Sequence, residues 1–344
     1  MNHTALNTTF SSCSFSFSPL NPANISPDLR AVFIARIVVN AVTCPLIILL
    51  NILVIVAVKT KRQLRTKSNI ALACLSTTDL VIGLVVQPLH IASASLLLKG
   101  EQNMFCTLTD LSNTVIIACL LASFYHFILM SAERYVAIKH PFTYETQVTE
   151  IRIIVASCLA WAVAIILYSK NLLTIAILVI FQMLLAVVAV YFNVSVYKEV
   201  RRQETQIAVN QVSLQAKKKL LKNKKAFYTT LIVLLVILLC YIPTRICIVV
   251  LLLSKEKIPE NVRHIAIYLL PLMPVLNSLF NPLIYAVRIR HFRVALIQLL
   301  SRKTIAQAEQ LERKIFGPRE CGVNANAELG QGGARRQDAW QEND

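Results

Sequence analysis

The chain has little charge and very few acids. Of its 344 residues, 15% are charged, and Asp plus Glu number 18 against 35 Lys plus Arg. Because soluble domains carry about 25% charged residues, this composition excludes an ordinary cytosolic enzyme and a disordered chain. It also excludes a nucleic-acid-binding protein, whose basic residues would lie on a polar domain rather than between apolar runs. The sequence shows no phosphate-binding loop, metal-binding helix motif or nucleophile with a base, so we do not expect an enzyme.

Apolar residues are abundant: they make up 56% of the chain and raise its mean hydropathy to +0.60. A transmembrane helix needs about 20 mostly apolar residues to cross about 30 Å of hydrocarbon. Seven segments meet or nearly meet this requirement, namely 31–58, 69–98, 103–138, 153–168, 172–197, 227–253 and 265–287. We therefore predict an all-α membrane protein built as a seven-transmembrane helix bundle. Only the third and sixth spans look long enough to project beyond the bilayer.

Basic residues gather in the loops 59–67 and 198–225 and again at 288–303, after the seventh span. Because loops rich in Lys and Arg stay in the cytoplasm, we predict a multi-pass plasma-membrane protein with its amino terminus outside. The N-terminal tail supports this orientation, since it carries N-glycosylation sequons at Asn2, Asn7 and Asn24, which mark a segment outside the cytoplasm.

Each span carries a small set of polar, aromatic or proline residues. They are Asn51, Leu75 and Asp79, Glu133-Arg134-Tyr135, Trp161, Tyr191, Cys240-Tyr241-Ile242-Pro243, and Asn281-Pro282-Leu283-Ile284-Tyr285. In this order and spacing they resemble the rhodopsin-like (class A) G-protein-coupled receptors. The resemblance implies a receptor that binds an extracellular ligand and activates a heterotrimeric G protein. We expect an extracellular glycosylated tail at 1–30, a receptor domain at 31–300 that ends in a short amphipathic helix begun by Phe292, and a disordered cytoplasmic tail at 301–344.

A looser similarity points to the melanocortin receptors and their adenosine- and lipid-binding relatives. It rests on Met183 at a position that is proline in most such receptors, and on a second outer loop that is almost absent. Where the acids of the melanocortin calcium-and-peptide site belong, this chain has Leu89, Thr109 and Asn113. A melanocortin-type peptide ligand is therefore not implied.

The resemblance assigns a switch to the inner ends of the spans. It implies that Arg134, set between Glu133 and Tyr135, contacts the G protein once the sixth helix swings outward, and that Tyr191 and Tyr285 hold it there. Many relatives latch this arginine with an acid at the foot of helix six. Residues 222–225 are Lys-Asn-Lys-Lys, which offers no carboxylate, so we expect raised basal signalling.

Three further residues belong to this switch. Pro243 and Pro282, the latter preceded by Asn281, each remove a helix hydrogen bond and create a hinge. Tyr241 takes the place of the tryptophan toggle that is usual at the pocket floor; ordinary packing of Tyr241 in the bundle is the alternative.

A small-cation site is predicted at mid-depth in the bundle. Ser123 lies 11 residues before Arg134, which is about 16 Å along a helix, at the level expected for Asp79, Asn277 and Ser278. One carboxylate with hydroxyl and amide oxygens suits a hard cation, and the resemblance implies an allosteric sodium ion. The alternative is a protonated, hydrogen-bonded Asp79 without an ion. We expect no other cofactor.

The outer half of the bundle should hold the ligand. The resemblance places the ammonium-binding acid of amine receptors at Ile116, so an amine is disfavoured. Arg245 suits a carboxylate or phosphate group, although pairing with Asp110 or with backbone carbonyls, or snorkelling outward, would also explain it. His90, Asn113, Tyr268 and His264 could line the same pocket, whose floor is Tyr241, although a structural or rim position is the favoured alternative for each of these four. A lipid-like or other anion, a nucleoside or a peptide is favoured as the ligand.

The only cysteines expected on the outer side are Cys13 and Cys106, so we predict a disulfide between them. A basic stretch at 217–225 would contact anionic membrane lipid or the G protein. Phosphorylation of the C-terminal tail is confined to Ser301 and Thr304, because no Ser or Thr follows. We therefore expect only weak tail-dependent recruitment of arrestin.

Two other classes of function stay open. A transporter or channel would show an inverted repeat or several charges along its pathway, and neither is visible in the seven unequal spans. A receptor-like scaffold that signals without a ligand of its own is the second alternative. Ligand-dependent nucleotide exchange on a G protein distinguishes the receptor from both.

Overall fold

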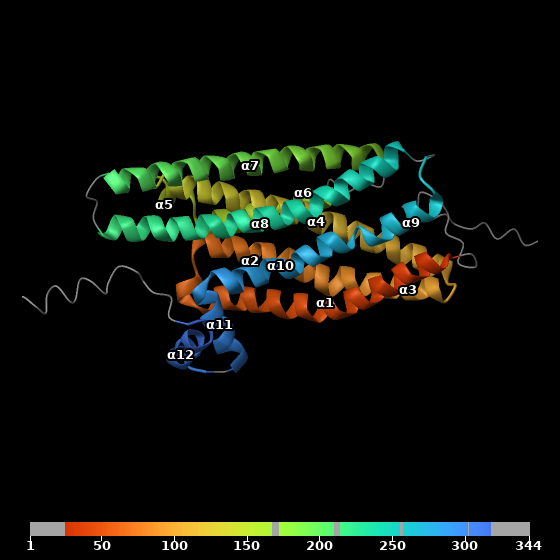
Figure 1. The fold of residues 1–344 in the computed structure, drawn as a ribbon, viewed down its shortest axis with the longest axis horizontal. Helices are drawn as coiled ribbons and strands as arrows, with labels where there is room; N and C mark the ends of the chain where they lie inside the picture. The colour runs from red at the N-terminus through yellow and green to blue at the C-terminus, as the bar shows by residue number, and fades with distance from the viewer. Residues whose placement is uncertain (1–24, 167–171, 210–213, 255–256, 302, 318–344) are drawn as a thin grey trace, which may run out of the picture. The chain divides into compact units, whose positions relative to one another are not determined.

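The computed structural model describes residues 25–166, 172–209, 214–254, 257–301 and 303–317. All regular structure in those residues is helical (Figure 1). In chain order the elements are α1 (Pro27–Thr60), the 3₁₀ turn η2 (Arg62–Leu64), α2 (Lys67–Val81), the π turn η3 (Ile82–Val86), α3 (Gln87–Leu98), α4 (Gln102–Lys139), α5 (Tyr144–Gln147), α6 (Glu150–Ile166), α7 (Leu172–Val209), α8 (Leu214–Leu253), α9 (Glu260–Leu269), α10 (Leu272–Arg288), α11 (Arg290–Ser301) and α12 (Ile305–Phe316).

Six helical stretches among the described residues are long and apolar enough to cross a membrane. Two of them are composite, since α2, η3 and α3 together form the second span, and α9 with α10 forms the last. We assign α6 as the remaining span because its 17 residues lie at the lower limit for crossing the hydrocarbon. The expected all-helical membrane bundle is thus confirmed.

One expectation about span length is wrong. We expected only the third and sixth spans to be longer than the bilayer, but α7, the fifth span, has 38 residues, which is about 57 Å of helix. The apolar run 172–197 is followed by a polar stretch that remains helical to Val209. Its charged side chains pair along the helix, as Arg201 with Glu204 and Arg202 with Glu199, and such i,i+3 pairs support an exposed helix.

The helices pack around α4, which contacts α2, α3, α6, α7 and α8. We call the end of the bundle at Pro27, Leu98 and Gln102 the outer end, and the end at Thr60 and Lys139 the inner end. Helices α7 and α8 lie side by side (Figure 1). Apolar side chains on the outward faces of the long helices are exposed, which suits helices surrounded by lipid rather than by water.

One local feature starts α1, and another fixes how α1 meets the second span. Helix α1 begins at a cap in which the Ser26 hydroxyl accepts from the Leu29 amide at 3.3 Å, with Pro27 at its first position. In the second span, a β-carbon on Gly83 would lie 2.9 Å from Cγ1 of Ile48, and the Cys44 thiol donates to the Gly83 carbonyl at 3.3 Å. Only glycine permits this approach.

The chain divides into two compact units between Phe292 and Arg293, so the unit that contains the bundle ends before residue 300. The expected amphipathic helix is α11. The expectation of a disordered tail from residue 301 is wrong for Ile305–Phe316, which form α12. Two features account for this helix: a capping box between Thr304 and Gln307, and a buried ion pair within the second unit, from Arg293 Nη2 to the Glu312 carboxylate at 2.6 Å.

Candidate functional site

A buried polar centre joins the first, second, third and last spans. Asp79 is fully buried on α2, and one of its oxygens accepts a hydrogen bond from the Asn281 amide of α10 at 2.9 Å. Asn51 of α1 donates to the Ser278 backbone carbonyl at 3.2 Å. Ser123 of α4 is hydrogen-bonded to the Thr78 hydroxyl at 2.8 Å. The structure therefore connects all four spans through polar contacts around one carboxylate.

The oxygens of this centre are mostly unsatisfied. Buried side-chain oxygens without a hydrogen-bond partner in the described residues belong to Asn51, Asp79, Asn277, Ser278 and Asn281. Buried polar atoms are normally paired. One carboxylate oxygen and several neutral oxygens, all buried, make up a set of ligand atoms that fits a small hard cation. Of the residues predicted for sodium, Asp79, Asn277 and Ser278 belong to this set, whereas the Ser123 hydroxyl is engaged with Thr78.

At the inner end of α4, Arg134 and Glu133 form a close ion pair. The Arg134 Nε lies 2.5 Å from one Glu133 oxygen, and its Nη2 donates to the other at 2.7 Å. The hydroxyl of Tyr144, in the short helix α5 that follows, donates to the same Glu133 oxygen as Nη2. Burial and the Glu133 carboxylate raise the pKa of Tyr144 above its usual value, so its hydroxyl stays protonated as a donor.

The aromatic residues expected to hold Arg134 lie elsewhere in this structure. Tyr285 is fully buried, and its hydroxyl has no hydrogen-bond partner in the described residues. Tyr191 is 60% exposed and packs against Phe192, with ring centres 6.0 Å apart. Tyr135 packs on the other side of Phe192 at 5.3 Å. The structure does not bring Tyr191 to the arginine.

Both predicted hinge prolines lie inside helices, Pro243 in α8 and Pro282 in α10. One turn before Pro282, Ser278 supplies the carbonyl that Asn51 binds. Two residues before Pro243, the buried Tyr241 ring lies edge-on to Phe124 of α4, with ring centres 5.8 Å apart. The polar centre thus includes a residue of α10, and Tyr241 belongs to α8, and each of these helices contains a proline.

A narrow pocket between α4, α7 and α8 brings together part of the predicted ligand site. It is lined by Phe124, Gln182, Met183, Ala186, Leu238, Tyr241, Ile242 and Arg245. Tyr241 and Arg245 therefore line one pocket, and its use as a ligand site stays a prediction. Asn113, Ile116 and Tyr268 do not line it. Tyr268 lies instead against Phe33 of α1, with ring centres 4.8 Å apart.

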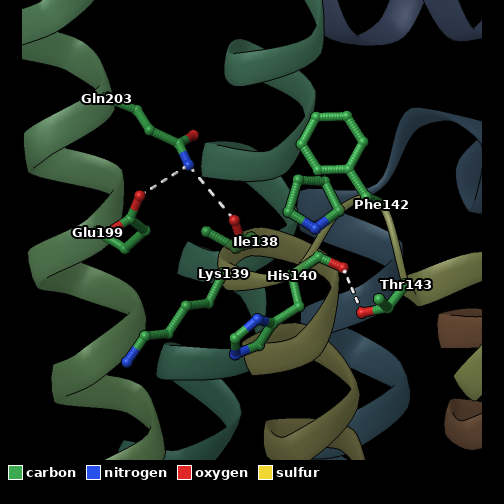
Figure 2. Close-up of a pocket in the computed structure, with 8 residues that line it drawn as sticks. Ile138, Lys139, His140, Phe142, Thr143, Glu199 and Gln203 are labelled. Atoms are coloured by element: carbon green, nitrogen blue, oxygen red, sulfur yellow. Dashed lines mark hydrogen bonds between the residues drawn. The ribbon is translucent and has the colours of Figure 1, made fainter.

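A second pocket, of about 300 Å³, opens at the inner end (Figure 2). Its lining includes the loop residues His140, Phe142 and Thr143 together with Gln203 of α7. The Gln203 amide donates to the Ile138 carbonyl at 3.3 Å. Phe142 is 97% exposed. An aromatic side chain presented at the polar end of the bundle offers an anchor of the kind that protein interfaces bury.

Cys106 is disulfide-bonded. The other cysteines of the described residues, Cys44, Cys74, Cys119, Cys158, Cys240 and Cys247, are free. The partner of Cys106 therefore lies outside the described residues, so pairing with Cys13 stays a prediction. The sequons at Asn2, Asn7 and Asn24 also lie outside them.

Three residues that the structure places in polar clusters are not among the site residues predicted from the sequence. Thr78 and Tyr144 act through side-chain hydrogen bonds across helices, and no local pattern signals these. The third, Arg36, is buried on α1 with 3% of its surface exposed. The sequence could have indicated Arg36, because it is a basic residue inside an apolar run, and charges at bilayer depth are costly and tend to be functional.

Comparison with known proteins agrees with this geometry. Residues 50–173 and 167–285 match the family described as "7 transmembrane receptor (rhodopsin family)". The muscarinic acetylcholine receptor M3 of Bos taurus is 33% identical over 144 residues, which are 42% of this chain and 24% of that receptor. The histamine H2 receptor of Canis lupus familiaris is 30% identical over 135 residues, 38% of this chain and 37% of the receptor. The human histamine H2 receptor is 29% identical over 140 residues, 41% of this chain and 38% of its own length. The matched stretches thus span well under half of each relative.

Proposed function

Since the chain belongs to the rhodopsin family of seven-transmembrane receptors, we propose that its outer end faces the extracellular side of the plasma membrane and binds a ligand. Its inner end then activates a heterotrimeric G protein. The Glu133–Arg134 pair carries the proposal. It is a charged pair at the inner end of the central helix, and the loop residue Tyr144 donates a hydrogen bond to its carboxylate.

The ligand we propose carries an anionic group rather than an ammonium. Arg245 and the buried Gln182 are the polar side chains of the pocket between α4, α7 and α8, and Tyr241 and Phe124 supply its aromatic surface. Ile116, at the position that resemblance gives to the acid of amine receptors, is buried and apolar. A carboxylate or phosphate group on a lipid, nucleotide or peptide suits the guanidinium. The likeness to acetylcholine and histamine receptors therefore supports the receptor class and not their ligands.

The transducer surface we propose combines Arg134 with the exposed Phe142. Arg134 supplies a cation that becomes available when Glu133 releases it, and Phe142 supplies an apolar anchor beside it in the chain. The basic stretch at 217–225 would add attraction to anionic lipid or to the G protein.

The deciding experiment is nucleotide exchange by purified receptor in lipid nanodiscs, measured against a panel of heterotrimers. Small anions, nucleosides, lipids and peptides are screened as stimuli, with Arg245→Ala as the binding control and Arg134→Gln as the coupling control. We expect exchange above the receptor-free rate that Arg134→Gln abolishes, and a stimulus whose effect Arg245→Ala removes. Failure of every heterotrimer under every stimulus, with correctly folded receptor, would reject the proposal in favour of a transporter or channel, or of a receptor-like scaffold that signals through other partners without a ligand of its own.

A further inference from the structure

A buried arginine lies in the outer half of α1 without a counter-charge. Arg36 is 3% exposed, and its Nε has no hydrogen-bond partner in the described residues. No carboxylate of those residues forms an ion pair with it. The segment that precedes α1 supplies none either, because the first acid in the sequence is Asp28. A buried cation without a counter-charge is destabilising, so an anion supplied from outside the described residues would stabilise Arg36.

The residues around Arg36 form an ordered arrangement. An apolar cluster at the outer end includes Phe33 of α1, Ala94 of α3 and Phe105 of α4, with Tyr268 of α9. Residues three or four apart share one face of a helix. One turn inward from this cluster, on the same faces, the three helices α1, α3 and α4 therefore present polar residues: Arg36, His90 and Thr109. The next turn inward presents another three: Asn40, Gln87 and Ser112.

These polar residues are buried and poorly satisfied. His90 is fully buried, and neither of its ring nitrogens has a hydrogen-bond partner in the described residues; the hydroxyls of Thr109 and Ser112 are also unpaired there. Arg36 lies over the Tyr268 ring at 5.8 Å and is close enough to His90 for the two to interact electrostatically. The cluster thus offers a guanidinium, an imidazole N–H and two hydroxyl donors, and no carboxylate.

We propose that Arg36 and His90 form a buried anion site between α1, α3 and α4, which takes the carboxylate or phosphate head of an amphiphile. The guanidinium fork binds such a group through two parallel hydrogen bonds. The apolar body of the same molecule would extend outward beside the apolar cluster that includes Phe33 and Phe105. None of the residues of this site lines the pocket of Arg245. The anion site can therefore be tested separately from the proposed receptor function.

The test is the melting temperature of purified receptor in phosphatidylcholine nanodiscs. The probes are dodecanoate, monododecyl phosphate, the uncharged dodecanol and inorganic phosphate. At about 100 times its Kd, an anionic probe should raise the melting temperature by about 5 °C, whereas dodecanol should not. The measurements use the Arg245→Met background, so that the pocket between α4, α7 and α8 does not contribute to the rise. In that background Arg36→Met should remove the rise, and Arg30→Met, which changes an exposed arginine of the same helix, should keep it. His90→Gln should reduce the rise in melting temperature but not abolish it, because Arg36 keeps its charge.

Ligand-free Arg36→Met should melt at the wild-type temperature or above, because it replaces an uncompensated buried charge with an apolar side chain. A lost response is then not a folding defect. A rise with inorganic phosphate that needs Arg36 would support the site and assign its specificity to the head group alone. The proposal is overturned if neither anionic amphiphile stabilises the protein, if dodecanol is as effective, or if Arg36→Met still responds.

Discussion

Tyr144 donates a hydrogen bond to Glu133, so a loop residue fastens the acid that in turn holds Arg134. The lock at the inner end therefore lies within α4 and the loop that follows it. The foot of α8 takes a different partner, since Lys224 of α8 is paired with Glu204 of α7. The two ion pairs share no residue, so we expect the outward swing of α8 and the release of Arg134 to be separate events.

Removing the Tyr144 hydroxyl should raise basal signalling. A hydrogen bond to a charged group contributes about 1.5–3 kcal/mol, and if it is lost on activation, Tyr144→Phe raises the ratio of active to inactive receptor about tenfold or more. The measurement is ligand-free nucleotide exchange at matched surface expression. Tyr197→Phe is the control, because the hydrogen bond that the Tyr197 hydroxyl makes within the described part of the chain is with the exposed Arg201 on its own helix. Unchanged or lower exchange in Tyr144→Phe would show that Glu133 needs no loop residue to hold Arg134.

An acid introduced at the foot of α8 should lower basal signalling. Asn223 is partly buried and is preceded and followed by lysines, and the described residues at this end of α8 offer Arg134 no carboxylate. Asn223→Glu would supply the missing partner, and a partly exposed ion pair worth about 1 kcal/mol changes the equilibrium about fivefold. Asn223→Gln, which matches the size without the charge, should behave like the wild type. Equal basal exchange in the Glu and Gln variants would count against the missing latch.

Exchange of sodium for choline should lower the melting temperature of the ligand-free receptor. The unpaired oxygens around Asp79 would lose their cation, and the stabilisation that binding provides would go with it. Asp79→Asn should melt at the same temperature in both salts, whereas Asp110→Asn, an equal charge change at the outer end of α4, should keep the wild-type difference. A wild-type receptor indifferent to sodium would instead support a protonated Asp79 without an ion.

The spans were predictable because apolar length is a strong local signal, and the motif residues placed Asp79 and Asn281 on facing helices. The extent of α7 was not predictable in the same way. Its continuation to Val209 is a polar segment with i,i+3 charge pairs. From sequence alone, a polar segment of this kind is equally consistent with a loop. The helix at Ile305–Phe316 depends on a cap and on an ion pair with Arg293, which is distant in sequence.

A residue of the candidate site could be predicted from the sequence where its type and its position along a span are enough to assign its role. It was not predictable where function depends on which side chains meet. Ser123 lies at the right depth for the cation site, yet its hydroxyl is taken by Thr78. Tyr268 lies at the outer end as expected, yet it packs under Arg36 rather than beside Arg245. Only tertiary packing decides these partners.

Arrestin recruitment should depend little on the C-terminal tail. The only phosphorylatable residues at or beyond the end of α11 are Ser301 and Thr304, and Thr304 is occupied as the cap of α12, accepting from the Gln307 amide at 3.4 Å. Truncation after Lys303 should therefore leave proximity-assay signals nearly unchanged when a receptor kinase is co-expressed. Truncation after Phe316, which keeps α12, is the matched control. Strong recruitment that disappears only with the shorter chain would refute this expectation.

Gly83→Ala should destabilise the bundle, although alanine normally favours a helix by about 1 kcal/mol over glycine. The added β-carbon would lie 2.9 Å from Ile48 Cγ1 and 3.1 Å from Ile47 Cγ2. Both atoms are close to a helix backbone, so α1 itself must move, and overpacking of this kind costs about 1–3 kcal/mol. We expect a lower melting temperature, and a double-mutant cycle with Ile48→Ala should return part of the loss because that change removes the nearest atom. Coupling close to zero, or a Gly83→Ala protein as stable as the wild type, would mean that α1 and the second span are free to separate here and that the contact does not fix how they pack.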